Sequence, residues 1–202
     1  MISIKDISIT RSGKLVVDGF SAELKSGTIT AVIGPNGCGK SSLLAAIAGD
    51  IPIANGEIYY GKKRLSEMSI SQLAQIRSVV MQSRNYWLSF TVRDILAMGQ
   101  DGASIARIDQ VLLSLNMVGF SEQSVTTLSG GEAQRLEIAR ALVRESDVYL
   151  LDEPMSAQDS ASRAAIIELL KNLRSQGKTL LIITHSDEKS LDWCDQIFDL
   201  GS

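Results

Sequence analysis

The sequence is poor in the residues that mark metal, redox and secreted proteins. It has one histidine and two cysteines among 202 residues, and Cys38 and Cys194 stand alone, without the C-x-x-C or His/Cys spacing of a zinc or redox site. A chain of this length with 45% hydrophobic residues can bury a substantial core without disulfides. We therefore expect a reduced, cytoplasmic setting.

A basic surface and a membrane-spanning segment are also missing from the sequence. The net charge is -3 and the lysines and arginines are dispersed, so nucleic acid is not expected as a ligand. Residues 1–6 lack the apolar core of a signal peptide, and no apolar stretch approaches the length that a bilayer requires. Any role at a membrane is expected to come through a partner.

The most informative segment is a glycine-rich loop. Residues 34–42 match the pattern G-x-x-x-x-G-K-[ST], whose backbone NH groups surround nucleotide phosphates while the lysine reaches the outer phosphates and the hydroxyl holds magnesium. Residues 28–33 predict a buried strand before the loop and residues 41–48 a helix after it, which is the setting that the loop needs. The residues predicted to bind ATP here are Gly34, Pro35, Asn36, Gly37, Cys38, Gly39, Lys40, Ser41 and Ser42, with Ser41 also a magnesium ligand.

Two carboxylates close an apolar run later in the chain. Residues 148–151 predict a buried strand that ends at Asp152 and Glu153, where α/β sheets bind ligands. We predict that Asp152 holds magnesium through water and that Glu153 orients and helps to deprotonate the attacking water, because phosphoryl transfer depends on positioning and charge stabilisation. The alternative is a solvated strand end before a turn at Pro154, which the phosphate loop disfavours.

A second glycine-centred segment lies at residues 128–132. Ser129 and Glu132 have the spacing of a capping box in front of a helix. Gly130 and Gly131 remove side chains from the same helix N-terminus, so exposed NH groups and the Ser129 hydroxyl can closely approach a γ-phosphate. We expect the segment to be both a capping box and a phosphate-binding helix end, since a capping box alone does not require two glycines.

The remaining pattern predicts how these motifs are arranged. Residues 2–33 alternate β-rich runs with turns, as in an antiparallel sheet, and residues 91–118 predict helices that are broken at Gly99 and Gly102. After Gly130 the chain predicts a parallel α/β core. The elements predicted there are a helix at 131–144, a strand at 147–151, a helix at 160–175 and a strand at 179–183.

On these motifs the chain resembles the ATP-binding cassette (ABC) ATPases over nearly its whole length. The resemblance implies an α/β fold with a P-loop NTPase (RecA-like) core, an N-terminal antiparallel β subdomain and an inserted α-helical subdomain at about 83–130, in one domain spanning 1–202. Residues 128–132 correspond to the signature motif, which completes the ATP site of a second subunit. A head-to-tail dimer, of identical chains or of paralogues, with two ATP molecules and Mg²⁺ is therefore implied.

The resemblance also implies roles for residues outside the loop. Gln82 senses magnesium and the membrane partner, Asp159 belongs to the D-loop at 156–159, and His185 is the switch histidine that contacts the γ-phosphate and holds Glu153 and water in place. A lone histidine is usually structural. His185, however, follows a buried strand that emerges at the same sheet edge as Glu153. The implied catalytic residues are Lys40, Gln82, Glu153 and His185.

Three positions depart from the family pattern. Arg11 stands where an aromatic residue usually stacks on adenine; a guanidinium plane can stack on a purine, but a surface turn is equally compatible with residues 11–14. Gln158 stands where leucine is commoner in the D-loop, which affects packing across the dimer. The sequence stops at Ser202, earlier than most relatives, so the terminal strands and helix of the usual cassette are expected to be absent.

Segments around residues 49–52, 73–82 and 90–99 resemble the ATPases of importers for iron-siderophores, haem and vitamin B12. That resemblance implies transmembrane permease subunits, a substrate-binding protein, and a location at the cytoplasmic face of the membrane. Export of another cargo, or a soluble non-transport ABC ATPase acting as a mechanical switch, are the alternatives. A binding module without hydrolysis is disfavoured because Lys40, Glu153 and His185 are all present.

Aromatic residues cluster after Gln82 in a chain that is 5% aromatic. Exposed rings at Tyr86 and Trp87 would suit a groove that receives a permease, and Phe90 fits either that groove or a small core of the helical insertion.

Overall fold

The computed structural model describes residues 1–81, 89–98 and 104–201. Gln82, Tyr86 and Trp87, which carry the expected permease-facing surface, lie outside the described residues. So do Gly99 and Gly102, where the sequence predicts breaks between helices.

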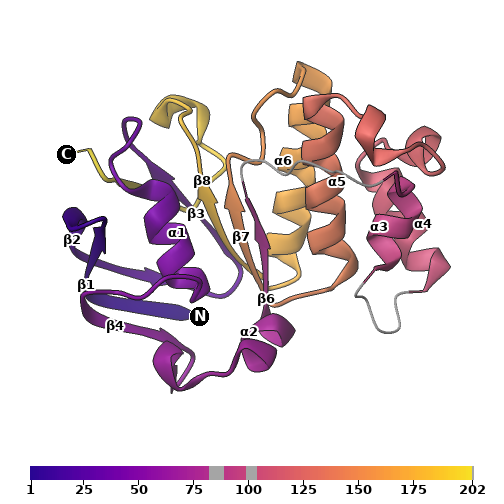
Figure 1. The fold of residues 1–202 in the computed structure, drawn as a ribbon. Coiled ribbons are helices and arrows are strands. Elements are labelled where there is room, and N and C mark those ends of the chain that lie inside the picture. The colour runs from indigo at the N-terminus through magenta and orange to yellow at the C-terminus, as the bar shows by residue number, and fades with distance from the viewer. Residues whose placement is uncertain (82–88, 99–103, 202) are drawn as a thin grey trace.

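A five-stranded parallel sheet forms the centre of the fold (Figure 1). In spatial order its strands are β6 (Arg77–Val80), β7 (Val148–Asp152), β8 (Thr179–Ile183), β3 (Thr28–Ile33) and β9 (Gln196–Asp199). Every residue of β7 and β8 is buried, as expected for parallel strands that are covered on both faces. Successive side chains enter two different hydrophobic cores: Tyr149 and Leu151 pack in one, and Val148 and Leu150 in the other.

Helices and a second sheet cover the two faces of the parallel sheet. Helix α1 (Lys40–Ala48) lies on one face, between it and the N-terminal strands, while α5 (Gly130–Val143) and α6 (Ser160–Ser175) lie on the other (Figure 1). Leu43 and Ile47 of α1 pack in the core that contains Val148 and Leu150. Leu136 of α5 and Ile166 of α6 pack in the core that contains Tyr149 and Leu151. The predicted parallel α/β core is confirmed, and the helix at 160–175 and strand at 179–183 agree with their predicted bounds.

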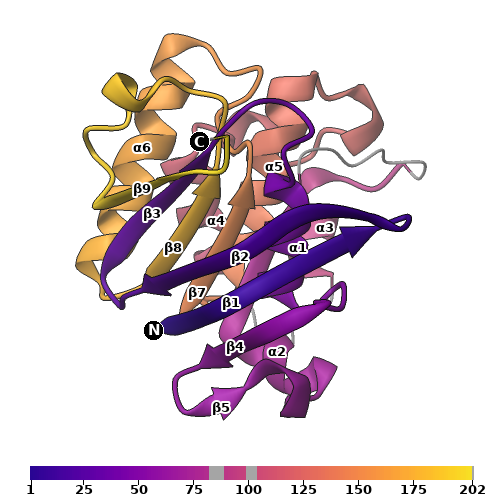
Figure 2. The same cartoon turned by 90° about the vertical axis from the view of Figure 1, so that its left-hand side faces the viewer.

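The N-terminal strands form the predicted antiparallel sheet (Figure 2). In spatial order they are β2 (Lys14–Leu24), β1 (Ile2–Arg11), β4 (Asn55–Tyr60) and β5 (Lys63–Arg64). Ser12 and Gly13 join β1 to β2 with φ angles of 50° and 77°, the left-handed pair that a tight hairpin turn requires. Arg11 pairs with Lys14 directly before this turn.

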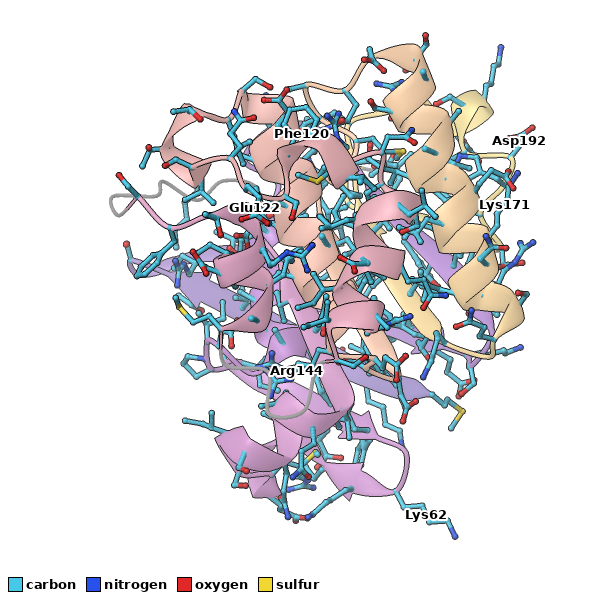
Figure 3. All side chains as sticks on the ribbon, turned by 90° about the vertical axis from the view of Figure 1, so that its right-hand side faces the viewer. Lys62, Phe120, Glu122, Arg144, Lys171 and Asp192 are labelled. Atoms are coloured by element: carbon cyan, nitrogen blue, oxygen red, sulfur yellow. The ribbon has the colours of Figure 1, made fainter. Side chains whose placement is uncertain are left out.

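Two short helices form an outer layer against α5 (Figure 3). They are α3 (Val92–Ala97) and α4 (Ile105–Ser114), and both lie within the predicted helical range of 91–118. Thr91 begins α3 with a capping box, and α4 buries Ile108, Val111 and Leu112 in the core on the α5 side. The remaining short elements are η1 (Leu65–Glu67), α2 (Ile70–Ile76), η2 (Val118–Phe120), η3 (Val125–Thr127) and η4 (Glu188–Ser190).

The C-terminal strand β9 was not predicted from the sequence. It pairs in parallel with β3, from Thr30 opposite Gln196 to Ile33 opposite Asp199. Its residues are half-buried or exposed, so the apolar run that marks the other parallel strands is missing. Among the described residues, no helix has the length and apolar character to cross a bilayer.

Candidate active site

Three neighbouring strands end at the same edge of the parallel sheet and carry the predicted site residues there. Strand β3 leads into the glycine-rich loop, β7 ends at Asp152, and His185 follows β8 by two residues. Because β7, β8 and β3 are adjacent in the sheet, their carboxyl ends bring these segments together. A cavity of about 330 Å³ lies there, lined by Arg11, Val16, Asn36, Gly37, Gly39, Lys40, Ser41, Ser42, Asp152, Glu153, Ile183 and His185.

The loop backbone requires glycine where it turns into α1. Gly39 has a φ angle of 106°, and an added Cβ would lie 2.5 Å from the carbonyl oxygen of Val16. Gly39 is the N-cap of α1 and offers no side chain to its first NH groups, and the first turn of α1 has no acidic residue. These NH groups therefore face the cavity side of the loop without a capping carboxylate or hydroxyl, which is the arrangement that binds phosphate.

Lys40 and His185 meet below the loop. The Nζ atom of Lys40, a buried residue, donates to the carbonyl oxygens of Gly34 at 2.7 Å and Pro35 at 2.9 Å, and lies 3.4 Å from Nδ1 of His185. The lone histidine of the chain is thus part of the site and not of the core.

Asp152 has the properties of a magnesium ligand. Its side chain is 2% exposed, and its Oδ1 atom is buried without a hydrogen-bond partner among the described residues. Burial raises the pKa of the Asp152 carboxyl, against the opposing effects of the Ser41 hydroxyl and the Lys40 charge. A buried carboxylate oxygen beside a serine hydroxyl fits Mg²⁺, which is bound by one or two carboxylates together with phosphate oxygens and water.

Glu153 is held in a strained backbone conformation. Its φ angle is 53°, a left-handed value that is uncommon for a non-glycine residue and concentrates at functional sites. Its NH group donates to the carbonyl oxygen of Ile183 at 2.9 Å, which ties Glu153 to the end of β8. This hydrogen bond helps to hold the strained conformation, because Glu153 follows β7 directly in the chain and is bonded to the end of β8.

The Glu153 carboxyl faces His185. The distance from Oε1 to Nε2 of His185 is 2.9 Å, an ion-pair distance, although Oε1 has no aligned hydrogen bond among the described residues. Burial raises the pKa of Glu153; the His185 and Lys40 charges oppose that rise, and Asp152 adds to it. A carboxyl with a raised pKa beside a histidine suits the positioning and deprotonation of water.

The signature segment lies on a different element. Ser129 is the N-cap of α5: its hydroxyl accepts from the NH of Glu132 at 3.4 Å, and the Glu132 carboxylate accepts from the NH of Ser129 at 2.7 Å. The predicted capping box is thus present. An added Cβ at Gly131 would lie 2.7 Å from the carbonyl oxygen of Ala157, whereas one at Gly130 would meet nothing within 4 Å. Gly131 is required by the fold itself, and Gly130 leaves the helix end open.

The structure brings together part of the predicted site. Arg11 lines the cavity and also ends the β1 strand at the hairpin turn, so its two interpretations are compatible in space. Asp159 does not line the cavity; its carboxylate caps α6 by accepting from the NH of Ser162 at 2.7 Å. Ser129, Gly130 and Gly131 also lie outside the cavity lining, as do Gly34, Pro35 and Cys38 of the loop, and Gln82 lies outside the described residues.

One residue near the site was missed from the sequence. Gln134 of α5 is buried, and its Nε2 atom donates to the carbonyl oxygen of Glu153 at 3.4 Å. A glutamine in the first turns of a helix has the appearance of a solvent-facing residue, so only the tertiary packing identifies this contact.

The family model described as ABC transporter matches residues 17–156, which is more than half of the chain. The chain belongs to the ABC transporter family. The hemin import ATP-binding protein HmuV of Rhodococcus jostii (strain RHA1) is 32% identical to it over 200 residues, which cover 95% of this chain and 68% of that protein. The zinc transport system ATP-binding protein TroB of Treponema pallidum (strain Nichols) is 33% identical over 211 residues, covering 99% and 78%.

Solved structures agree with this family. The ATP-binding cassette MJ0796, in a dimeric post-hydrolysis state bound to ADP and Pi, has a TM-score of 0.88 and 25% identity, and the match covers 100% of this chain and 94% of that chain. The ABC chain is therefore an ATPase that binds ATP with Mg²⁺ and hydrolyses ATP to drive transport. When bound, Mg²⁺ would be held by Ser41 and Asp152 and would neutralise phosphate charge.

Proposed function

We propose that this ABC ATPase energises import of an iron chelate, haem or cobalamin through a membrane permease. Its likeness over 95% of the chain to a hemin import ATP-binding protein carries this proposal. A second cargo class, free Zn²⁺ or Mn²⁺, is favoured by the TroB relative and by the manganese transport system ATP-binding protein MntB of Listeria monocytogenes serovar 1/2a (strain ATCC BAA-679 / EGD-e), which is 31% identical over 99% of this chain and 86% of that protein.

The site residues are assigned to the steps of hydrolysis as follows. The glycine-rich loop and Lys40 hold the ATP phosphates, and the cavity position of Arg11 supports stacking on adenine. Glu153 orients and helps to deprotonate water, and His185 fixes Glu153 through the 2.9 Å contact. Gln82 senses magnesium. Ser129 and its two following glycines, together with Asp159, complete the site of a second subunit, either an identical chain or a paralogue.

The assembly that we propose is peripheral to the membrane. One ABC ATPase domain spans residues 1–202, with an inserted helical subdomain at about 83–130, and it sits at the cytoplasmic face through permease subunits. A substrate-binding protein delivers cargo on the other side. The same fold also occurs in export: a bacterial Atm1-family ABC exporter with ATP bound matches with a TM-score of 0.88 at 24% identity, over 99% of this chain and 37% of that chain. Export of another cargo is therefore the alternative direction.

A groove lined by Met81, which precedes Gln82 in the sequence, supports the docking part of the proposal. A cavity of about 400 Å³ is lined in part by Arg77, Met81, Met98 and Arg144. Two methionines offer an adaptable apolar surface, and Met98 is 52% exposed. Arg144 is exposed at the end of α5 (Figure 3) and makes no side-chain hydrogen bond or ion pair with other described residues. We assign this groove, together with Tyr86 and Trp87 of the segment that follows Met81 in the sequence, to a short cytoplasmic helix of the permease.

Copurification and cargo-stimulated hydrolysis test the proposal. The chain is purified with its native permease, reconstituted in lipid discs, and assayed for ATP hydrolysis with haem, a ferric siderophore, cobalamin, Zn²⁺ or Mn²⁺ and the matching binding protein. A metal chelate should stimulate hydrolysis. Stimulation by Zn²⁺ or Mn²⁺ alone would identify the free metal ion as the cargo. A chain that copurifies with no membrane protein, and whose hydrolysis no cargo stimulates, would favour the mechanical-switch alternative.

A charge reversal tests the docking groove. Arg144→Glu and Trp87→Ala should leave basal ATP hydrolysis largely intact and reduce both copurification with the permease and stimulated hydrolysis. Lys62→Glu, at an exposed lysine between β4 and β5, is the control and should copurify normally. Equal loss of folding and basal activity in Trp87→Ala would show that this ring belongs to the core.

A further inference from the structure

The D-loop is bonded to the signature helix of the same chain. Residues 156–159 connect the strand that ends in the two carboxylates to α6, and they lie beside the first turns of α5. Ala157 has a left-handed φ angle of 56°, and its carbonyl oxygen occupies the space that a Cβ on Gly131 would need. The two segments are therefore in backbone contact at one point.

Gln158 joins these segments with both ends of its amide. Its Nε2 donates to the carbonyl oxygen of Gly131 at 2.9 Å and, more weakly, to that of Ser156 at 3.4 Å. Its Oε1 accepts from Nη1 of Arg135 at 3.0 Å, and the same nitrogen donates to the Ser162 hydroxyl at 2.9 Å. Carbonyls can only accept and a guanidinium can only donate, so the partners fix the orientation of the amide.

This network requires an amide at position 158. A leucine, which is commoner at this position in the family, would make neither bond. A glutamate would keep the acceptor for Arg135 but would direct a carboxylate at the Gly131 carbonyl oxygen. Gln134 adds a parallel connection, because it joins α5 to the backbone of Glu153. The first turns of α5 are thereby tied to both ends of the segment from Glu153 to Gln158.

We propose that Gln158 is a positioning residue that couples the signature segment to Glu153 of the same chain. This inference rests on the proposed function, in which the signature segment contacts the ATP held by a second subunit. A shift of Ser129–Gly131 on engaging that phosphate would be transmitted through the amide of Gln158 to the D-loop, and from there to the carboxylate that activates water. The two ATP sites of the dimer would therefore respond to each other.

Cooperative kinetics of the full chain test this role. ATP hydrolysis is measured against ATP concentration for the parent, Gln158→Leu, Gln158→Glu and Gln176→Leu, with nucleotide binding to the monomer measured by fluorescence. Gln176 is exposed at the other end of α6 and makes no side-chain bond among the described residues, so it is the matched control. Both substitutions of Gln158 should lower kcat roughly 10- to 30-fold, the equivalent of about two net hydrogen bonds. They should also reduce the Hill coefficient towards 1 and leave monomer binding unchanged.

The outcomes separate this inference from the proposed function. If the parent is cooperative and both Gln158 variants have the same kcat and Hill coefficient as the parent, the coupling role alone is overturned. A parent that hydrolyses ATP without cooperativity would overturn the shared site and the coupling role together. If Gln158→Leu lost thermal stability, the size-matched Gln158→Glu would decide, and a parental Hill coefficient in that variant would overturn the inference.

Discussion

Two adjacent buried carboxylates lower the free energy of unfolding of this chain. Asp152 and Glu153 are 2% and 7% exposed, and burial is the largest cause of the raised pKa of each. Each carboxyl also loses hydrogen bonds to water, and Oδ1 of Asp152 finds no replacement among the described residues. Such a group persists because it serves the bound state, in which a cation and phosphates supply the missing partners.

Asp152→Asn should therefore stabilise the protein without nucleotide and divalent cations. The raised pKa means that the folded state binds more protons than the unfolded state between the two pKa values, so the free energy of unfolding falls as the pH rises through that window. At neutral pH the full cost is present, and its removal should raise the Tm by about 2–4 °C if it amounts to about 1 kcal/mol. Thermal unfolding in chelator at neutral pH measures this.

The pH dependence and a surface control complete that experiment. Below about pH 4, the ordinary range of an aspartate, the advantage of Asp152→Asn should vanish. Asp192→Asn, at an exposed position, should have little effect at either pH (Figure 3). A variant less stable than the parent at neutral pH would contradict an uncompensated buried charge at Asp152.

At the scale of elements, the start of α5 carries a capping box and is also the segment that we propose to bind the ATP of a second subunit. The reciprocal bonds between Ser129 and Glu132 satisfy the helix end, and the bonds from Ser129 lower the pKa of the Glu132 carboxyl. Gly131 gives room to the Ala157 carbonyl, whereas a Cβ added at Gly130 would meet no described atom within 4 Å. The open side of the helix end is thus available to a partner.

The two neighbouring glycines form a matched pair for mutation. Gly131→Ala should lower the stability of the monomer by about 1–3 kcal/mol, because the added Cβ forces the Ala157 carbonyl to move. Gly130→Ala should leave monomer stability unchanged or slightly higher, since alanine favours helix, and should weaken dimerisation driven by ATP. Denaturant unfolding and light scattering measure these two effects, and equal stability of both variants would contradict the contact with Ala157.

The sequence correctly predicts those elements whose hydrophobic pattern and end signals lie within one short segment. The buried run of β8 and the capped, amphipathic α6 agree with their predicted bounds, and the motif residues lie at strand ends as expected. β9 was missed because its residues are half-exposed and its pairing with β3 depends on distant parts of the chain. The bonds of Gln134 and Gln158 could not be foreseen either, since each joins segments about 20 residues or more apart.

At the scale of the whole molecule, the residues that we propose to bind ATP lie in two places. The cavity at the sheet edge contains the glycine-rich loop, Asp152, Glu153 and His185, but the signature residues Ser129–Gly131 do not line it. A site that needs both must be completed by another copy or a paralogue, and the MJ0796 cassette with which this chain shares its fold is dimeric with ADP and Pi bound. Binding and association should accordingly be linked.

Light scattering of the Glu153→Gln chain with and without ATP and Mg²⁺ tests whether two chains share each ATP site. Because this variant should bind ATP but turn it over at least about 100-fold more slowly, its mass should shift from the 21.8 kDa monomer towards twice that value. Adding Ser129→Arg should weaken the shift, and Lys40→Ala should abolish it together with tight ATP binding. A mass that stays at the monomer value when ATP binding is saturated would contradict the shared site.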